Sequence, residues 1–418
     1  MKRLFVWFAF LFFLAGCGRL ADGGAGERVT AVSPPTPTVS PRATPTRSRY
    51  ANAASRECAN PVPEDRQFPL PPWPNTNFCR HSVPYDEFLW GGRSRDSIPA
   101  LNNPELETIA EAELWLTDRE PVLVLQLGDE ARAYPIPILI WHEIVNDEVA
   151  GQPVVVTYCP LCNSGLAFAR TLDGQTLEFG VTGILRNADL IMFDRQTESW
   201  WQQFTGEAIV GEMTGAKLTP LPVSMVSFAD FKTQFPNGRL LSIYTGYDRR
   251  YGENPYLNYD SRFSRGTKFY QGELDDRLVP KMRVMTVVVG DTAVAYPYDI
   301  LSETGAVNDE VAGQPLVVFW KSGTNTPLYS QYIAEARDAG SAAVYSQDTA
   351  GQTLTFTAVE DGFVDEETGS VWNIWGTAVS GPLTGTQLTS LNGNEFFWFA
   401  WAAFRPDTLV YGTTDGAD

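Results

Sequence analysis

The chain has 418 residues, of which 44% are hydrophobic and 19% charged, and its formal net charge is −19. This length is sufficient for two domains with sizeable cores. The strong negative charge argues against a nucleic-acid partner, because a phosphate backbone would be repelled. We therefore expect a globular protein with an acidic, solvated surface.

The first residues have the pattern of an export signal. A basic start at residues 1–3 precedes an apolar run, residues 4–15, that is too short to span a bilayer as a folded helix. The run leads through Gly16 into Cys17, which resembles the bacterial lipobox. The resemblance implies that residues 1–16 are a lipoprotein signal peptide and that Cys17 carries a lipid. The alternative is an ordinary signal peptide that contains Cys17 by chance.

The segment from residue 17 to residue 60 is rich in Pro, Thr, Ser and Ala and has few large apolar groups. Such a segment cannot pack, so we expect an extended tether between the lipid and the folded part. The protein would then be anchored in the bacterial cell envelope. Its anchor would lie on the outer face of the cytoplasmic membrane or in the outer membrane, with the membrane as its one predicted partner.

Five cysteines are present in the chain. Apart from Cys17, they form two pairs that are close in sequence, Cys58 with Cys79 and Cys159 with Cys162. In an oxidising compartment we expect the first pair to form a disulfide at the start of the folded part.

Alternating apolar residues and turn signals predict short strands after residue 120. Residues 122–127 and 131–134 flank Gly128-Asp129, a hairpin turn, and Asp173-Gly174 is predicted to be a second turn. Between them, Pro137 can begin a short helix in which Ile138, Trp141, His142 and Val145 form one stripe. His142 is therefore expected to point inward.

Internal comparison indicates that the folded part is a duplicated unit. The nine residues VNDEVAGQP occur at 145–153 and again at 307–315, and shorter matches link 131–135 with 293–297, 174–177 with 351–354, and 213–215 with 383–385. At the offset of the nine-residue repeat, His142 corresponds to Thr304, Cys159 to Lys321 and Cys162 to Thr324. All three candidate ligands are replaced together, so we interpret the second unit as a degenerate copy without the site.

Six motifs are similar to those of a bacterial family of domains of unknown function. They are GG with RDSIPAL (91–101), WHEIVND (141–147), YCPLCNS (158–164, part of TYCPLCNS at 157–164), LRNADL (185–190), WQQ (201–203) and YGENPY (251–256). The resemblance is close over residues 85–300 and looser elsewhere. It implies the domain type and no particular reaction.

The Cys-x-x-Cys pair, Cys159 and Cys162, follows an apolar run at residues 154–156 and carries the main functional hypothesis. With His142 it supplies two thiolates and one imidazole, a donor set suited to zinc or copper. Met192, Asp189 and Asp194 are candidates for a fourth ligand. The sequence therefore predicts a transition-metal site, with copper or zinc as the cofactor.

Two other interpretations of the same residues stay open. The Cys-x-x-Cys spacing also occurs in thiol-disulfide oxidoreductases, although residues 163–168 are predicted to be a turn and a strand instead of the helix that such a site needs. The second alternative is a non-catalytic structural or interaction lipoprotein. In it, Cys159 and Cys162 form a structural disulfide and His142 is a hydrogen-bonded core residue.

Charged residues among apolar ones between residues 184 and 201 form a second cluster. They either line a pocket beside the thiols or form ion pairs that lock the sheet, and the second interpretation is favoured. The residues concerned are Arg186, Asp189, Asp194, Arg195 and Glu198.

Together these patterns predict an α+β, β-rich fold built of two tandem pseudo-repeats with short helices. The predicted boundaries are 61–270 for the first unit, which carries the site, and 271–418 for the second.

Overall fold

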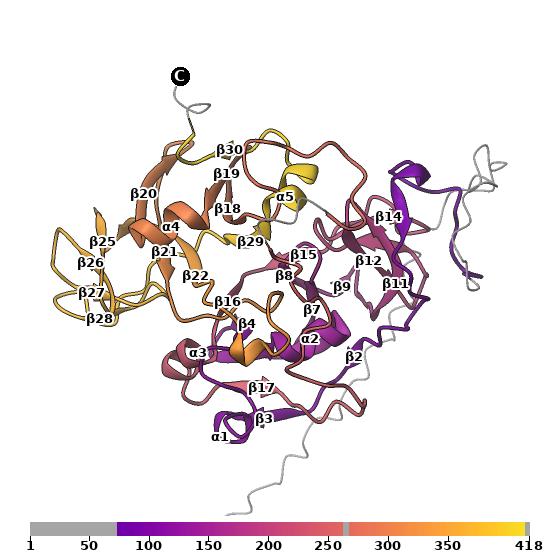
Figure 1. Cartoon of the computed structure of the whole chain (residues 1–418), viewed down its shortest axis with the longest axis horizontal. Coiled ribbons are helices and arrows are strands. Elements are labelled where there is room, and N and C mark those ends of the chain that lie inside the picture. Colours follow the sequence, from indigo (N-terminus) through magenta and orange to yellow (C-terminus); the bar gives the residue numbers. More distant parts are fainter. Residues whose placement is uncertain (1–72, 262–266, 414–418) are drawn as a thin grey trace, which may run out of the picture. The chain divides into compact units, whose positions relative to one another are not determined.

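The structure is a computed structural model that describes residues 73–261 and 267–413, and all structural statements below concern these residues. They belong to one compact unit, Ser48–Asp418. Short strands dominate, and the few helices are one or two turns long (Figure 1). The helices are α1 (Ile109–Ala112), α2 (Ile136–His142), α3 (Phe228–Gln234), α4 (Tyr298–Thr304), α5 (Trp398–Phe404), and the 3-10 turns η2 (Tyr85–Glu87) and η3 (Ile333–Glu335). The prediction of a β-rich α+β fold is confirmed.

Three five-stranded sheets form in the described residues before residue 242. The first has the order β15 (Thr219–Leu221), β8 (Ser164–Ala169), β7 (Gln152–Cys159), β6 (Ile144–Val149), β2 (Leu101–Asn102). The second is β16 (Val223–Ser227), β4 (Pro121–Leu127), β5 (Glu130–Pro135), β17 (Arg239–Leu241), β3 (Leu106–Thr108). The third is β1 (Phe88–Trp90), β11 (Phe179–Arg186), β12 (Asp189–Asp194), β13 (Trp200–Gln202), β14 (Glu207–Val210).

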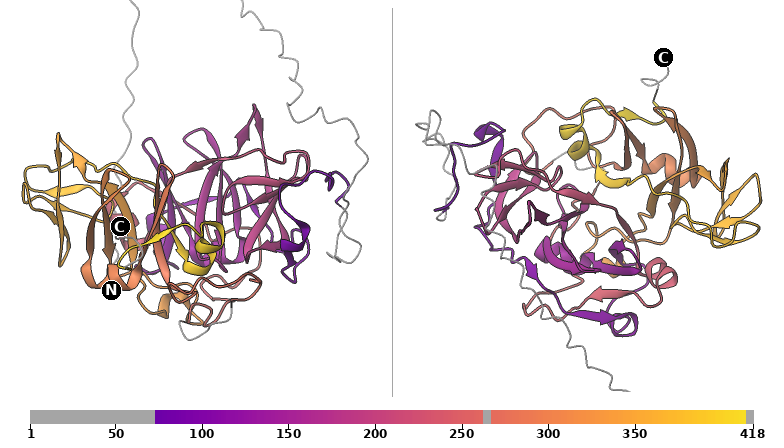
Figure 2. Two further views of the ribbon diagram at one scale, coloured as in Figure 1. Left: turned by 90° about the horizontal axis from the view of Figure 1, so that it is seen from above. Right: turned by 180° about the vertical axis from the view of Figure 1, so that it is seen from behind.

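Smaller sheets follow in the C-terminal part, and the last of them lies at the edge of the molecule in Figures 1 and 2. They are β29 (Asn394–Phe397), β18 (Arg283–Val289), β19 (Thr292–Pro297), β30 (Leu409–Val410); then β20 (Ala306–Val311), β21 (Gln314–Lys321), β22 (Ser341–Ser346); then β25 (Phe356–Val359), β26 (Gly362–Asp365), β27 (Val371–Trp372), β28 (Ala378–Ser380). Two isolated hairpins complete the strands: β9 (Thr171–Leu172) with β10 (Gln175–Thr176), and β23 (Asp348–Thr349) with β24 (Gln352–Thr353).

Both predicted hairpin turns are confirmed. β4 and β5 pair antiparallel across Gly128-Asp129, and β9 pairs with β10 across Asp173-Gly174. Asp173 and Gly174 have φ of 49° and 78°, the left-handed pair that a two-residue hairpin turn requires.

Helix α2 is shorter than its sequence pattern predicts. It begins with Pro137 in its first turn, and all of its residues except Trp141 are buried. The helix ends at His142 because Glu143 takes a left-handed conformation with φ 59°. The prediction that Val145 continues the helical stripe is therefore wrong, since Val145 lies in β6.

The asparagine of the nine-residue repeat makes equivalent hydrogen bonds at both occurrences of the repeat. The Asn146 side chain exchanges two hydrogen bonds of 2.8 Å with the Phe179 backbone and so joins β6 to β11. Asn308 makes the equivalent pair with Phe356, at 2.8 and 2.9 Å, and joins β20 to β25. In each case the side-chain amide hydrogen-bonds to the strand as the backbone of a neighbouring strand would, so these asparagines have a structural role.

The largest hydrophobic core contains residues from both parts of the chain. Cys159 and Cys162 belong to it together with Val284, Phe397 and Trp398. Strand β29 packs against β8, and the Phe397 backbone N–H donates to the Cys162 carbonyl at 2.9 Å. The Cys-x-x-Cys turn therefore lies in a core that the C-terminal residues help to complete.

The predicted signal peptide, Cys17 and the tether (residues 17–60) lie outside the described residues. Within the part of the chain that the structure describes, no helix has the length and apolar composition needed to cross a bilayer.

Candidate metal centre

The Cys-x-x-Cys turn connects the central strands β7 and β8. Cys159 is the last residue of β7 and pairs with Ser164, the first residue of β8. The Cys162 N–H donates to the Cys159 carbonyl at 3.2 Å, which closes the turn and brings both sulfurs to one side. Both thiols are free, and the two residues are 2% and 0% exposed.

Asp189 approaches the thiols from the third sheet. It opens β12, directly after a tight turn in which Asn187 and Ala188 have φ of 52° and 65°. The Sγ atoms of Cys159 and Cys162 and a carboxylate oxygen of Asp189 all lie within 4.8 Å of one another, and all three residues are buried. The structure thus forms a group of two sulfurs and one carboxylate.

The two oxygens of Asp189 differ in their surroundings. Oδ2 accepts hydrogen bonds from Gln202 Nε2 at 2.5 Å and from the Phe204 N–H at 3.0 Å. Oδ1 is buried without a hydrogen bond. A buried polar atom normally has a partner, so this oxygen is an available ligand atom.

Burial disfavours the ionised form of every acidic member of this group. It raises the pKa of the Asp189 carboxyl to about 7 and that of the Cys159 thiol above its usual range. The pKa of the Cys162 thiol is raised well above its usual value, again by burial first and then by Cys159 and Asp189. A bound cation would reverse these effects, because it stabilises the negative forms.

The predicted ligand set was His142, Cys159 and Cys162, and the structure brings Asp189 instead of His142 close to the two sulfurs. The imidazole is fully buried, and both nitrogens are hydrogen-bonded elsewhere. Nδ1–H donates to the Pro99 carbonyl at 2.7 Å, so Nε2 accepts from the Tyr251 hydroxyl at 2.6 Å. His142 is thus a hydrogen-bonded core residue, as the structural alternative predicted, whereas the Cys159–Cys162 disulfide of the same alternative is wrong because both thiols are free.

The charged cluster between residues 184 and 201 does not converge on the thiols, with Asp189 as the exception. Arg186 pairs with Glu87 at 2.6 Å, and Glu198 pairs with Arg95 at 2.9 Å. Asp194 accepts from Trp201 Nε1 at 2.9 Å inside the β12–β13 region.

Arg195 is the remaining member of that cluster, and Met192 is the sulfur-containing candidate for a fourth ligand. Arg195 forms an ion pair with Asp96 at 2.9 Å. Met192, a candidate fourth ligand, is buried in the same hydrophobic core as the two thiols. Of the two acidic candidates for a fourth ligand, the structure brings Asp189 and not Asp194 to the sulfurs.

Glu143 is a site residue that the sequence analysis did not single out. Its carboxyl group is buried, hydrogen-bonded to Tyr256, and close enough to Cys159 to raise the pKa of that thiol. Burial raises the pKa of Glu143 itself to about 8. The signal available in the sequence was a charged residue between an apolar helix and an apolar strand.

Residues of the C-terminal part hold the turn in place. Asn163, next to Cys162 and left-handed with φ 52°, donates from Nδ2 to the Glu395 carboxylate. Glu395 in turn pairs with Arg283 at 3.0 Å and accepts from the Tyr298 hydroxyl at 2.7 Å.

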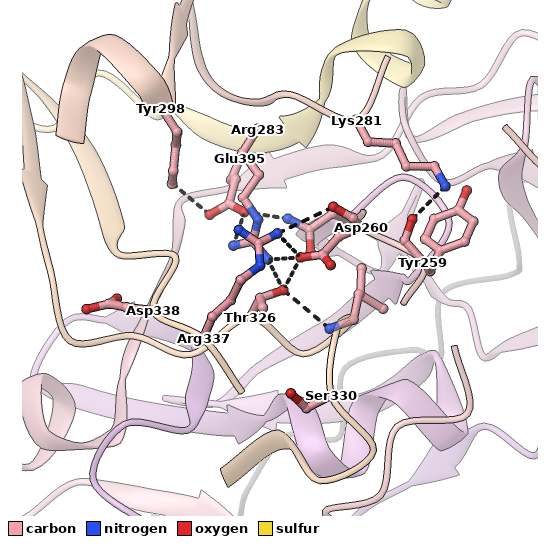
Figure 3. A network of polar contacts seen from close by, with 12 residues as sticks. Tyr259, Asp260, Lys281, Arg283, Tyr298, Thr326, Ser330, Arg337, Asp338 and Glu395 are labelled. Atoms are coloured by element: carbon pink, nitrogen blue, oxygen red, sulfur yellow. Dashed lines mark hydrogen bonds and ion pairs between the residues drawn. The ribbon is translucent and has the colours of Figure 1, made fainter. Parts of the chain in front are cut away.

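The network continues beyond Glu395. Figure 3 shows Arg283 between Glu395 and Asp260, with Arg337 converging on the same Asp260 carboxylate. Arg337 lies 3.0 Å from Asp260, and Thr326 donates to that carboxylate at 2.6 Å. The Cys-x-x-Cys turn is thus supported by a chain of paired charges, of which Glu395, Arg283 and Asp260 are buried.

The surroundings of the thiols differ from those of a redox dithiol. A nucleophilic thiolate needs a lowered pKa and access to its partner, whereas Cys159 and Cys162 are buried and have raised pKa values. The turn leads into strand β8, as predicted, and not into a helix whose N-terminus would stabilise a thiolate. These features weigh against the oxidoreductase interpretation.

The predicted disulfide pair Cys58 and Cys79 lies only partly within the described residues. Cys79 is disulfide-bonded. Cys58, its predicted partner, lies outside the described residues.

Fold and site together define a β-rich α+β protein with a buried dithiol–carboxylate group. The chain belongs to the family of proteins of unknown function DUF3179, whose family model matches residues 95–408. The resemblance to a family of domains of unknown function is thereby confirmed. No curated protein and no solved structure matches the chain.

Proposed function

We propose that this protein binds a transition-metal ion, zinc, through Cys159, Cys162 and Asp189. The observation that carries the proposal is the buried group of three donor atoms within 4.8 Å of one another, in which one Asp189 oxygen has no hydrogen bond. Two thiolates and a carboxylate are ligands that zinc accepts. Three protein ligands leave one position for water or another molecule, and the bound ion would supply a Lewis acid there.

The donor set favours zinc over copper. Copper(I) prefers soft thiolate and thioether ligands, whereas Asp189 adds a hard oxygen, and His142 does not join the group. Zinc is of intermediate softness and binds sulfur and oxygen together. Bound copper in place of zinc would change the identity of the metal but not the proposed ligands.

Metal binding should release protons. Asp189 is half protonated near pH 7 when metal-free, and both thiols carry their protons there because their pKa values are raised. The ligands must lose these protons to bind, so the apparent affinity for zinc should rise with pH.

Elemental analysis of the full chain, purified without chelator, tests the proposal. We expect about one equivalent of zinc per chain, and loss of this metal in the Cys159→Ser/Cys162→Ser and Asp189→Asn variants. Circular dichroism identifies variants that fail to fold. Folded wild-type protein that neither retains metal nor takes up added zinc or copper would contradict the proposal.

Two matched variants separate this site from the one predicted from the sequence. His142→Gln should retain the metal, because both imidazole nitrogens are used elsewhere. Asp194→Asn removes the charge of another buried carboxylate in the same strand, β12, and should also retain it. Loss of metal from His142→Gln and not from Asp189→Asn would restore the His142 site.

The tandem pseudo-repeat, with units at 61–270 and 271–418, is also proposed. Its support is the repeated order of strands around α2 and α4, and the equivalent contacts of Asn146 and Asn308. At the positions of the two thiols, Lys321 pairs with Asp230 and Thr324 bonds Ser341 at 2.6 Å. Both groups thus have other partners, which agrees with a second copy without a metal site.

The cell-envelope location is proposed on the signal-peptide and lipobox pattern alone. Cys17 would carry the lipid, and residues 17–60 would hold the folded part away from the membrane. Labelling of expressing bacteria with a radioactive fatty acid tests this. We expect label in the wild-type protein and none in Cys17→Ala, and an unlabelled wild-type protein would contradict it.

A further inference from the structure

A cavity of about 490 Å³ adjoins the candidate metal centre. Leu161, inside the Cys-x-x-Cys turn, and Leu190, next to Asp189, form part of its wall. Most of the wall is apolar, and Trp141, Ile98 and Phe269 supply much of it. A volume of this size is typical of small-molecule sites.

Five of the six motifs quoted in the sequence analysis contribute to this wall. Besides Leu161 and Leu190 from two of them, the other three supply Ile98, Trp141 and Tyr256. These motifs are far apart in the chain and come together at this cavity. Among them, Trp141 is the one residue of α2 that is not buried, and its partly buried side chain packs against the main core and lines the cavity.

The cavity has a positive rim in a strongly negative protein. Arg93 and Lys268 line it, and both are exposed. A neighbouring hollow of about 380 Å³ shares Arg93 and Trp141 with it and adds Arg249 and Arg250, together with Asp248. With a net charge of −19 the chain as a whole would repel an anion, so these cations make the region locally favourable to one.

The polar groups deeper in the wall suit hydrogen bonding. Glu143 and Tyr256 are bonded to each other, and Tyr259 donates to the Leu161 carbonyl at 3.0 Å. The wall therefore combines apolar area, a few oriented polar groups and positive charge at the entrance.

We propose that this cavity binds a small organic anion, namely a carboxylate with an aromatic or branched apolar body. The apolar wall takes the body, and Arg93 and Lys268 bind the carboxylate. This binding goes beyond the proposed function and does not require a metal ion, since the cavity is formed by protein groups alone.

Calorimetric titration of the full chain with 2-naphthoate and with its uncharged analogue 2-naphthamide tests the proposal. We expect saturable binding of naphthoate with one site per chain, and about tenfold weaker binding of naphthamide. The Arg93→Gln/Lys268→Gln variant should bind both compounds with similar, weak affinity. No binding of naphthoate at millimolar concentration, or equal binding of both compounds to the wild type, would overturn the proposal.

A matched pair of substitutions at one exposed wall residue controls for general effects. Leu257 is 57% exposed and lines the cavity, so Leu257→Glu and Leu257→Gln should both fold. Only Leu257→Glu adds a negative charge, so it should weaken naphthoate binding about tenfold more than Leu257→Gln does. Leu114→Glu, at an 85% exposed leucine outside the cavity wall, should leave binding unchanged.

The failure of this proposal is distinguishable from failure of the metal site. Zinc content measured on the Arg93→Gln/Lys268→Gln variant should equal that of the wild type. Naphthoate binding should persist in Cys159→Ser/Cys162→Ser. If naphthoate binding is lost in Cys159→Ser/Cys162→Ser but retained in Arg93→Gln/Lys268→Gln, the anion binds the metal ion and the cations at the cavity rim have no role.

Discussion

Residues in left-handed backbone conformations gather around the candidate metal centre. Glu143, Asn163, Asn187 and Ala188 have φ between 52° and 65°. Each such residue costs about 1 kcal/mol, although asparagine tolerates this conformation best. The end of α2, the Cys-x-x-Cys turn and the β11–β12 turn thus carry local strain where they meet, which is typical of a site organised for binding.

At the residue scale, His142 should make stability depend on pH. Burial lowers its pKa from 6.5 to about 4, so the folded protein keeps the ring neutral while the unfolded chain protonates it. This stability is fully present above pH 6.5 and is lost as pH falls towards 4, by about 3 kcal/mol. Urea unfolding of metal-free protein at pH 7 and pH 4 should show this loss as a difference between the wild type and His142→Gln, because Asp189 and Glu143, whose raised pKa values act in the opposite direction, are common to both proteins.

The matched control is His81→Gln. His81 is partly exposed, and its Nδ1 contacts the Val83 carbonyl at 2.9 Å. This variant removes a partly exposed imidazole and so shows whether loss of any histidine changes the dependence of unfolding free energy on pH. Identical slopes for His142→Gln and the wild type would show that the buried imidazole is not the source.

At the element scale, strand β29 is the support of the Cys-x-x-Cys turn. In this strand, the Glu395 carboxylate accepts a hydrogen bond from the Asn163 side chain, and the Phe397 N–H donates to the Cys162 carbonyl at 2.9 Å. The support comes from a strand more than 200 residues away in the chain. It is nevertheless built from charged groups that are almost fully buried and paired, which fixes their geometry.

Glu395→Gln should therefore weaken metal binding without touching a ligand. The amide keeps the shape but removes the charge that neutralises Arg283, so the turn loses part of its restraint. We expect about tenfold lower zinc affinity, a size usual for groups that orient metal ligands. Competition with a fluorescent zinc chelator measures it.

Glu310→Gln, on the exposed side of β20, is the matched control and should bind zinc as the wild type does. The comparison is made at a temperature at which circular dichroism shows all three proteins folded. Wild-type affinity in folded Glu395→Gln would mean that the network stabilises the fold alone.

At the scale of the whole molecule, the core does not divide at the predicted boundary between residues 270 and 271. The cluster that contains both thiols also contains Val284, Phe396 and Trp401. The side chain of Phe204, in the first part, stacks on Phe404 with ring centroids 4.4 Å apart. The two parts of the chain therefore share this largest hydrophobic cluster.

A chain that ends at residue 270 should consequently fail to fold cooperatively. Loss of the C-terminal residues exposes the apolar surface around Leu161 and leaves Asn163 without its carboxylate partner. We expect a broad thermal transition by circular dichroism and no retained zinc, against a sharp transition for the full chain. A sharp transition of the fragment would indicate that the first unit is an independent domain.

Much of the fold follows from local sequence patterns. The turns at Gly128-Asp129 and Asp173-Gly174 and the strands beside them were predictable, because glycine and aspartate permit the left-handed conformations of short hairpins. The inward direction of His142 was predictable from helical spacing. The sequence also predicted that the two thiols form the candidate site and that Asp189 is one of three candidates for a further ligand.

The choice among those candidates depended on contacts that no local pattern contains. The two imidazole nitrogens of His142 are hydrogen-bonded to Pro99 and Tyr251, and both of these residues lie far from His142 in the chain. Asp189 reaches the thiols because the β11–β12 turn ends beside the β7–β8 turn, in a different sheet.

The sequence by itself therefore determined the strands, the short turns, and the family to which the chain belongs, because these depend on neighbouring residues and on motifs. Only the tertiary structure decided which acid joins the two thiols, which residues line the cavity beside them, and that Glu395 supports the turn. Those contacts depend on how sheets pack, and packing joins residues whose separation in the sequence carries no periodic signal.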